Sequence, residues 1–217
     1  MGVAVYQIYY DDSQRTKLDE EFIPLYSKPY GDIITRERET AVIRHIYESG
    51  AYKSNTYTGC VSWKFKEKTR LSASQFLRHI DVHSDNDVYF ASCGQRQYSN
   101  IWIQGEKYHP GIIELTQHIL DNCNININIR ELEHKRDMTS FCNFWVGSQK
   151  FWVKYFNFIQ PVLEYIDNDL PDKYKKLLHI QADKKIKSNI FPFIYERILT
   201  TLLSIDSSIK YINIPRG

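Results

Sequence analysis

Segments with the pattern of β-strands alternate with segments of helical period along almost the whole of this 217-residue chain. Runs rich in β-branched and aromatic residues predict strands, and apolar residues three and four positions apart predict helices. Neither type of element can bury its apolar surface alone. The alternation therefore favours an α/β fold, with helices on both faces of a mostly parallel or mixed sheet. We expect a three-layer α/β/α sandwich in which residues 1–217 form a single domain.

The predicted strands are short and end at turn-forming or polar residues, and proline or glycine marks several ends of the predicted helices. Segment 13–35, with Pro24 and Pro29, predicts an irregular loop, and so does the polar and aromatic segment 93–111. Strands are expected at 3–9, 57–63, 87–92, 124–129, 141–146 and 209–214, and helices at 36–49, 72–80, 110–120, 149–166, 172–183 and 193–205.

Composition narrows the function classes. The net charge is +2, and Lys and Arg are interleaved with Asp and Glu, so no basic surface for nucleic acid is expected. No apolar run approaches the roughly 20 residues of a membrane-spanning helix. The four cysteines form no CxxC pair and have no histidine at zinc-finger spacing, so we expect buried thiols in a reducing, cytoplasmic compartment. The 16 Tyr, 11 Phe and 4 Trp either fill the core or form a site that stacks sugar or base rings.

Several catalytic signatures are absent from the sequence. There is no Gly-x-Gly-x-x-Gly, P-loop, Gly-x-Ser-x-Gly or HExxH motif, which argues against nucleotide redox enzymes, P-loop kinases, α/β-hydrolases and zinc proteases. Ligands of α/β sheets bind at the carboxyl ends of the strands. That rule directs attention to the segments 11–12, 62–65, 92–104 and 143–147.

Two of these segments carry residues suited to phosphates or to sugar hydroxyls. Lys64 follows a predicted strand and could provide a cation for a diphosphate, whereas Trp63 and Phe65 suit the core equally well. Asn143 lies among aromatic residues, where a buried amide is either a structural bridge or a ligand for sugar hydroxyls.

Two further pairs of residues carry acid–base or charge chemistry. Glu106 and His109, three residues apart, could act as a general base and its companion, although either could cap the following helix instead. Glu196 and Arg197 open a helix near the end of the sequence, where solvation is the usual fate of a charge pair.

Taken together, these residues resemble a known family across nearly the whole chain. The similarity is to glycosyltransferases of bacterial capsule and O-antigen gene clusters, and to galactosyltransferases with a glycosyltransferase-A-like fold. The motifs that carry it are Tyr10-Asp11-Asp12, the Glu39 helix, Tyr57 to Phe65, Asp87-Val88-Tyr89, Trp102 to Glu106, His109-Pro110-Gly111, Cys142 to Val146 and Tyr195-Glu196-Arg197-Ile198-Leu199.

The resemblance implies a mixed, glycosyltransferase-A-like sheet and an enzyme that moves a sugar, with galactose as one candidate, from a nucleotide-sugar donor, a UDP-sugar being favoured. The acceptor would be a lipid-linked surface polysaccharide, either lipopolysaccharide O-antigen or capsule. The enzyme would lie in the cytoplasm, at the inner face of the membrane or in a multidomain polymerase. Glu106 is expected as the base and His109 as its companion. Donor contacts are expected at Tyr10, Asp11, Asp12, Lys64, Asp87 and Arg197, and sugar or acceptor contacts at Trp63, Trp102, Gln104, Asn143, Trp145 and Glu196.

Metal-dependent members of that fold hold a divalent ion, Mn or Mg, through an Asp-x-Asp motif after a central strand. Here Asp85-Asn86-Asp87 precedes a predicted strand and Asp167-Asn168-Asp169 lies in a predicted turn. We therefore expect no dedicated metal ligands, with Lys and Arg neutralising the phosphates; a differently built divalent site is the alternative. The rival function is a non-catalytic carbohydrate-binding or scaffold module, which would bind sugar without a nucleotide.

Overall fold

The structure of the protein is a computed structural model that describes residues 2–28, 39–93, 98–178, 181–183 and 188–217. The main sheet contains β1 (Val3–Tyr9), β2 (Ile23–Tyr26), β3 (Tyr57–Ser62), β4 (Val88–Ala91), β5 (Trp145–Ser148) and β8 (Tyr211–Ile214), and β6 (Gln181–Asp183) pairs with β7 (Ser188–Asn189). The helices are α1 (Glu39–Glu48), α2 (Phe65–Thr69), α3 (Ala73–Val82), α4 (Ile101–Tyr108), α5 (Ile112–Asn122), α6 (Gln149–Asn168), α7 (Asp172–Leu178) and α8 (Phe191–Ile205). Short 3₁₀ turns lie at η1 (Asp12–Lys17), η3 (Ala51–Ser54) and η4 (Arg136–Met138).

The main sheet is mixed, with the strand order β2-β1-β3-β5-β4-β8. Its pairs are parallel except for the two made by β5, which runs antiparallel to both β3 and β4. The predicted α/β class and the mixed sheet are confirmed. The strand predicted at 209–214 is β8, which lies at one edge of the sheet.

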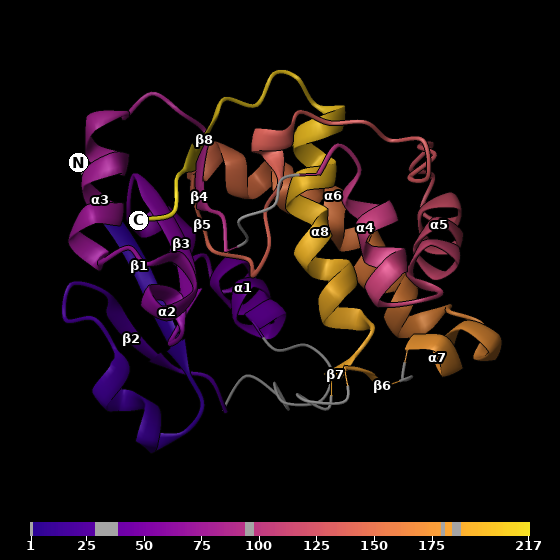
Figure 1. The fold of residues 1–217 in the computed structure, drawn as a ribbon, viewed down its shortest axis with the longest axis horizontal. Helices are drawn as coiled ribbons and strands as arrows, with labels where there is room; N and C mark the ends of the chain where they lie inside the picture. The colour runs from indigo at the N-terminus through magenta and orange to yellow at the C-terminus, as the bar shows by residue number, and fades with distance from the viewer. Residues whose placement is uncertain (1, 29–38, 94–97, 179–180, 184–187) are drawn as a thin grey trace.

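Apolar side chains cover both faces of the sheet. In β4, Val88 and Phe90 contribute to a core with residues of α1, α4, α5, α6 and α8, whereas Tyr89 and Ala91 contribute to a second core with residues of α2 and α3. Because successive side chains of a strand point to opposite faces, these two cores lie on opposite sides of the sheet. Figure 1 shows the larger group of helices gathered on one side and α3 on the other.

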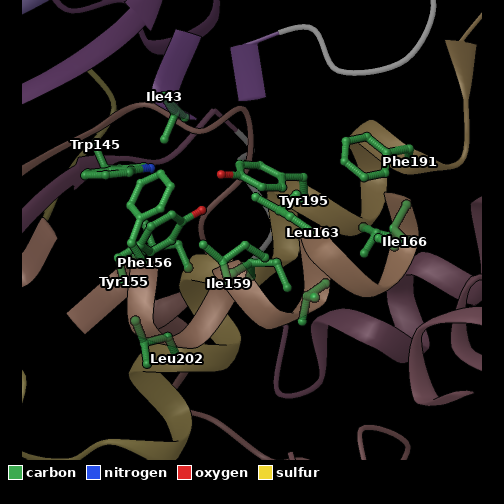
Figure 2. Packing of buried hydrophobic residues seen from close by; sticks show 14 of the residues in the cluster. Ile43, Trp145, Tyr155, Phe156, Ile159, Leu163, Ile166, Phe191, Tyr195 and Leu202 are labelled. Carbon is green, nitrogen blue, oxygen red and sulfur yellow. The ribbon is translucent and has the colours of Figure 1, made fainter. Parts of the chain in front are cut away.

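Much of the aromatic content fills the larger core. Trp145 and Trp152 pack with ring centroids 4.6 Å apart, and Trp145 and Tyr155 with centroids 4.9 Å apart. Figure 2 shows the aromatic rings of α6 facing those of β5 and α8. Trp152 Nε1 donates to the Thr58 carbonyl oxygen at 2.8 Å, so this buried indole is satisfied. Composition alone did not decide whether the aromatic residues fill the core or line a ligand site. In the structure, most of the large rings lie in the core.

Segment 124–129 is not a strand, although its alternating pattern predicted one. Ile125, Ile127 and Ile129 do face the larger core, but no neighbouring strand pairs with them. The Gln117 side chain takes the place of such a strand, because its amide donates to the Ile127 carbonyl oxygen and accepts from Ile129 N. A side chain from α5 thus satisfies two backbone groups of this segment.

Two segments predicted as loops contain regular structure. Segment 93–111 holds α4, whose start is capped by Asn100; its side-chain oxygen accepts from Trp102 N and Ile103 N. The described part of segment 13–35 holds β2, where Pro24 is tolerated because β2 is an edge strand. Residues 29–38, 94–97 and 179–180, parts of the loops predicted at 13–35 and 93–111 and of the helices predicted at 36–49 and 172–183, lie outside the described residues. The helix prediction is wrong for residues 181–183, which form β6, and the strand predicted at 141–146 begins only at Trp145, after a turn.

α6 is the longest helix, with 20 residues, but it carries charged groups along its length. Within the described ranges, no helix is both long and apolar enough to cross a bilayer.

Candidate functional site

The carboxyl ends of β1, β3, β4 and β8 meet at one edge of the sheet, because these strands run in the same direction. β5 runs the other way, so the residues that precede it reach the same edge. This edge therefore collects Tyr10, Trp63 and Ser92, which directly follow β1, β3 and β4, and Asn143, which lies two residues before β5. It is the position at which α/β sheets bind ligands.

The end of β1 is shaped by hydrogen bonds of Asp11. Its Oδ1 atom accepts from Ser13 N at 2.9 Å and from Ser13 Oγ at 2.6 Å, and these bonds hold the pKa of the Asp11 carboxyl below its usual value. Tyr10 N donates to Gln14 Oε1, while Asp12 is exposed. Asp11 and Asp12 thus lie at the predicted edge, but Asp11 already serves as the cap of η1.

Trp63, at the end of β3, is half-buried and lies between two lysines. The Nζ atom of Lys17 lies 4.8 Å from the indole centroid, and that of Lys64 lies 4.9 Å from it. Cation–π attraction favours each contact, yet two like charges on one ring repel each other. Neither lysine forms an ion pair with a described carboxylate. A cavity of about 610 Å³ lies beside this group. Its charged lining consists of two lysines and four carboxylates, namely Lys17, Lys66, Asp19, Glu20, Glu21 and Glu67.

The turn before β5 has an unusual backbone. Cys142 and Asn143 both have positive φ, 70° and 54°, a conformation that costs free energy in residues other than glycine and is tolerated best by asparagine. Asn143 is 5% exposed, and its Oδ1 atom has no hydrogen-bond partner among the described residues. A buried amide oxygen without a donor is rare, and it calls for a donor from a ligand or from water.

Lys68 of α2 lies next to this turn. Its Nζ atom donates to Cys142 Sγ at 3.2 Å and lies 5.6 Å from the centre of the Phe144 ring. Burial by itself would lower the pKa of Lys68, but Cys142 and the charges of Glu196 and Glu39 outweigh burial and raise it. Lys68 is therefore a partly buried ammonium group. Lys68 was not among the predicted site residues, although it follows Lys64, the N-cap residue of α2, by four positions and so lies on the same side of this helix.

Glu196 of α8 is half-buried, and its charge acts on Lys68, Cys93 and Arg197. The structure thus brings Glu196, a predicted sugar or acceptor contact, to the same edge as Asn143. The edge combines a buried amide, ammonium groups, a carboxylate and an indole. Such a set can bind a phosphorylated, hydroxyl-rich ligand and can accept a proton from it.

Three other predicted residues have different surroundings. Trp102 is fully buried in the larger core, and its Nε1 atom donates to Thr201 Oγ1 at 3.0 Å. Trp145, the first residue of β5, is also fully buried in that core, and its Nε1 atom has no hydrogen-bond partner among the described residues. Asp87 lies before β4, at the opposite edge of the sheet, and its Oδ2 atom accepts from Lys210 N.

Glu106, predicted as the base, spans the corner between α4 and α5. Its two carboxylate oxygens accept from Gly111 N at 2.9 Å and from Ile113 N at 3.0 Å, which caps the start of α5. His109 stacks on Phe193 with ring centroids 3.7 Å apart. The alternative considered for Glu106 in the sequence, a helix cap, is the geometry observed.

Arg197, predicted on the diphosphate, is 2% exposed and bound to the protein itself. Its guanidinium donates to the carbonyl oxygens of Ile101 and Phe193 and, at 2.6 Å, to Gln104 Oε1. Burial lowers the pKa of Arg197 to about 10, so it stays charged at neutral pH and joins α4 to α8. Gln104, predicted to touch a sugar, serves here as a partner of Arg197.

The two Asp-x-Asp sequences do not fit a metal at the carboxyl edge. Asp87 binds a backbone amide at the other edge, and Asp169 caps the end of α6. Among the described residues, no group of three or more His, Cys, Asp or Glu side chains is arranged to hold a metal ion.

No protein-family model, curated protein or solved structure matches this chain.

Proposed function

We propose that this chain is a glycosyltransferase that binds a nucleotide-sugar donor at the carboxyl edge of its sheet. The observation that carries the proposal is the buried, unpartnered Oδ1 atom of Asn143, held in a strained turn beside Lys68. A sugar hydroxyl is a suitable donor for this oxygen. Strained backbone that places a polar group at a strand edge is typical of functional sites.

The lysines support the diphosphate half of the proposal. Sugar transfer leaves a nucleoside diphosphate with growing negative charge, which positive groups must stabilise in the transition state. Lys64, the N-cap residue of α2, and Lys68 lie one helical turn apart, and Lys17 shares the Trp63 ring with Lys64. An anion bound beside Lys17 and Lys64 would offset their mutual repulsion. Arg197 has no part in this scheme, because its guanidinium is taken up by α4 and α8.

The catalytic base in this proposal is Glu196. An inverting transferase needs one group that takes the proton of the acceptor hydroxyl, at a distance of about 2.6–3.2 Å. Glu196 is half-buried, and its charge raises the pKa of Lys68 beside the turn before β5. Glu106 caps the start of α5 instead. Glu196 thus takes over the role that the resemblance gave to Glu106.

The finer assignments rest on the motif resemblance. They are the glycosyltransferase-A-like class, a UDP-sugar donor with galactose as one candidate, a lipid-linked bacterial surface polysaccharide as acceptor, and a cytoplasmic location at the membrane. A mixed sheet with helices on both faces is compatible with that class.

Release of nucleotide from UDP-, GDP- and CMP-sugars, measured with and without added manganese and a glycan acceptor, tests the proposal. We expect release with one nucleotide class, and a loss of about 10²–10⁴-fold in Glu196→Gln. The matched control is Glu164→Gln on α6, where the carboxylate only accepts from Gln160 at the surface. Absence of release with every donor would contradict the proposal, and glycan-array binding without a nucleotide would then favour the carbohydrate-binding module.

A further inference from the structure

Cys93 and Cys142 face each other at the carboxyl edge. In the antiparallel pair of β4 and β5, Phe90 lies opposite Trp145, and Ala91 N donates to the Phe144 carbonyl oxygen. Beyond this pairing the chain turns at Cys142 and Asn143, and the turn brings the Cys142 side chain to Cys93. The two thiols are within hydrogen-bonding distance of each other, which is the proximity that disulfide formation requires. Both thiols are free and half-buried.

The two thiols have different surroundings. Lys68 Nζ donates to Cys142 Sγ at 3.2 Å, and a cation beside a sulfur favours the thiolate, which is the reactive form. Cys93 Sγ lies 3.7 Å from the Phe141 carbonyl oxygen. Burial, followed by the neighbouring Cys142, raises the pKa of Cys93 well above its usual value, so Cys93 remains a thiol at neutral pH. The geometry thus gives one sulfur in contact with a cation and a second sulfur within reach of it.

We infer that Cys142 and Cys93 form an oxidant-sensitive thiol pair, in which Cys142 reacts with a hydroperoxide and Cys93 converts the product to a disulfide. The Cys142 thiolate attacks the terminal peroxide oxygen; the O–O bond breaks, the sulfur is oxidised to a sulfenic acid, and the peroxide is reduced to an alcohol or water. Cys93 sulfur then attacks Cys142 sulfur. The S–S bond forms, the S–O bond breaks, and the hydroxyl leaves with the Cys93 proton as water. This chemistry does not depend on the proposed glycosyltransferase activity.

The remaining cysteines provide internal controls. Cys60 is 1% exposed, and burial, with a smaller effect of Glu39, raises its pKa, so it is inert. Cys123 is half-buried like Cys142, but its sulfur contacts the Pro161 carbonyl oxygen, and burial raises its pKa. Among the described residues, no cation contacts Cys123. It is therefore the matched thiol that lacks an activating group.

The test is to treat the purified full chain with hydrogen peroxide, block the remaining thiols with an alkylating agent, and map the peptides by mass spectrometry before and after reduction. We expect a Cys93–Cys142 linkage that dithiothreitol reverses, with Cys60 and Cys123 still alkylated. In Cys93→Ser a sulfenic-acid probe should label Cys142, because the resolving thiol is gone. Cys123→Ser should behave as the wild type.

Lys68→Met should slow disulfide formation about tenfold, because the cation that contacts the Cys142 sulfur is removed, whereas Lys68→Arg should keep most of the rate. Circular dichroism of each variant checks that it is folded. The inference is overturned if Cys123 oxidises as fast as Cys142. It is also overturned if Cys142 goes directly to sulfinic acid without a linkage, or if the Cys93–Cys142 peptide never forms in a folded wild-type chain.

Discussion

Substitution of Glu106 tests whether its carboxylate acts in catalysis or caps the start of α5. Its oxygens accept from Gly111 N and Ile113 N at 2.9 and 3.0 Å, and Gly111 has a φ of 91° that places its amide toward α4. Glu106→Ala leaves both amides at the start of α5 without this partner and removes a negative charge from the positive end of the helix dipole. Glu106→Gln keeps one acceptor oxygen and loses the charge.

The expected cost follows from these contacts. A helix cap contributes about 1 kcal/mol, and a charge at the helix start adds about 0.3–1 kcal/mol. Glu106→Ala should therefore lower the free energy of unfolding by about 1.5–2 kcal/mol, and Glu106→Gln by about 0.5–1 kcal/mol. For a chain of this size, 1 kcal/mol corresponds to about 2–4 °C, so the alanine variant should melt about 3–8 °C lower.

Urea titration at neutral pH, followed by far-ultraviolet circular dichroism, measures this cost. Nucleotide release by the same preparations shows whether turnover changes beyond the loss of folded protein. An unchanged urea midpoint in Glu106→Ala would refute the capping role. A Glu106→Gln variant with wild-type stability and no turnover would restore Glu106 as the base and remove that role from Glu196.

Three further outcomes follow from single contacts. His134 Nε2 accepts from Ile101 N at 3.1 Å, and burial lowers the pKa of His134 below its usual value of 6.5. The contribution of the neutral histidine to the free energy of unfolding should therefore be complete above pH 6.5 and be lost as the pH falls through the folded pKa. Urea midpoints should decline from about pH 7.5 to about pH 5 in the wild type and stay flatter in His134→Gln. A Cβ atom on Gly59 would lie 2.1 Å from the Trp145 carbonyl oxygen, so Gly59→Ala should lower the free energy of unfolding in urea by about 3 kcal/mol or more. Gly50 has open space around it and a φ of 73°, so Gly50→Ala should lower it by about 1 kcal/mol. Asn143→Gly removes the strain of a positive φ and an oxygen without a hydrogen-bond partner, so the melting temperature of this variant should stay within a few degrees of the wild type. Its affinity for the nucleotide-sugar, measured by calorimetric titration, should fall about tenfold or more.

The layout of the fold was predictable where a local pattern and the tertiary context agree. Val3–Tyr9 forms a strand with the predicted bounds, and Ser72 caps α3 through the capping box that its sequence allows. Segment 124–129 shows where such reasoning fails. Its alternation correctly marks a buried face, but a strand needs a neighbour to pair with, and only the fold decides whether that neighbour is another strand or the side chain of Gln117.

The candidate site was predictable in place but not in composition. The rule for strand ends pointed to Asp11, Lys64 and Asn143, which all lie at the carboxyl edge. Glu106 and Arg197 have residue types suited to catalysis, but their hydrogen bonds to distant backbone groups are set by how α4, α5 and α8 meet. No local pattern reports such contacts.

Lys68 and Glu196 illustrate the opposite case. They come from α2 and α8, far apart in the sequence, and they act on each other only because both helices approach the turn at Cys142. Helical spacing relates Lys68 to Lys64, but it says nothing about a glutamate more than a hundred residues away.

The central claim, a nucleotide-sugar site at Asn143 and the neighbouring lysines, is tested most directly by the melting temperature of the chain with UDP, GDP, CMP and their sugar conjugates. A ligand at a hundred times its dissociation constant adds about 2.7 kcal/mol, which corresponds to roughly 5–11 °C here. We predict such a shift with one nucleotide class in the wild type and a much smaller shift in Asn143→Gly and Lys68→Met. A wild-type melting temperature that none of these ligands changes, or an equal shift in all three proteins, would contradict the account.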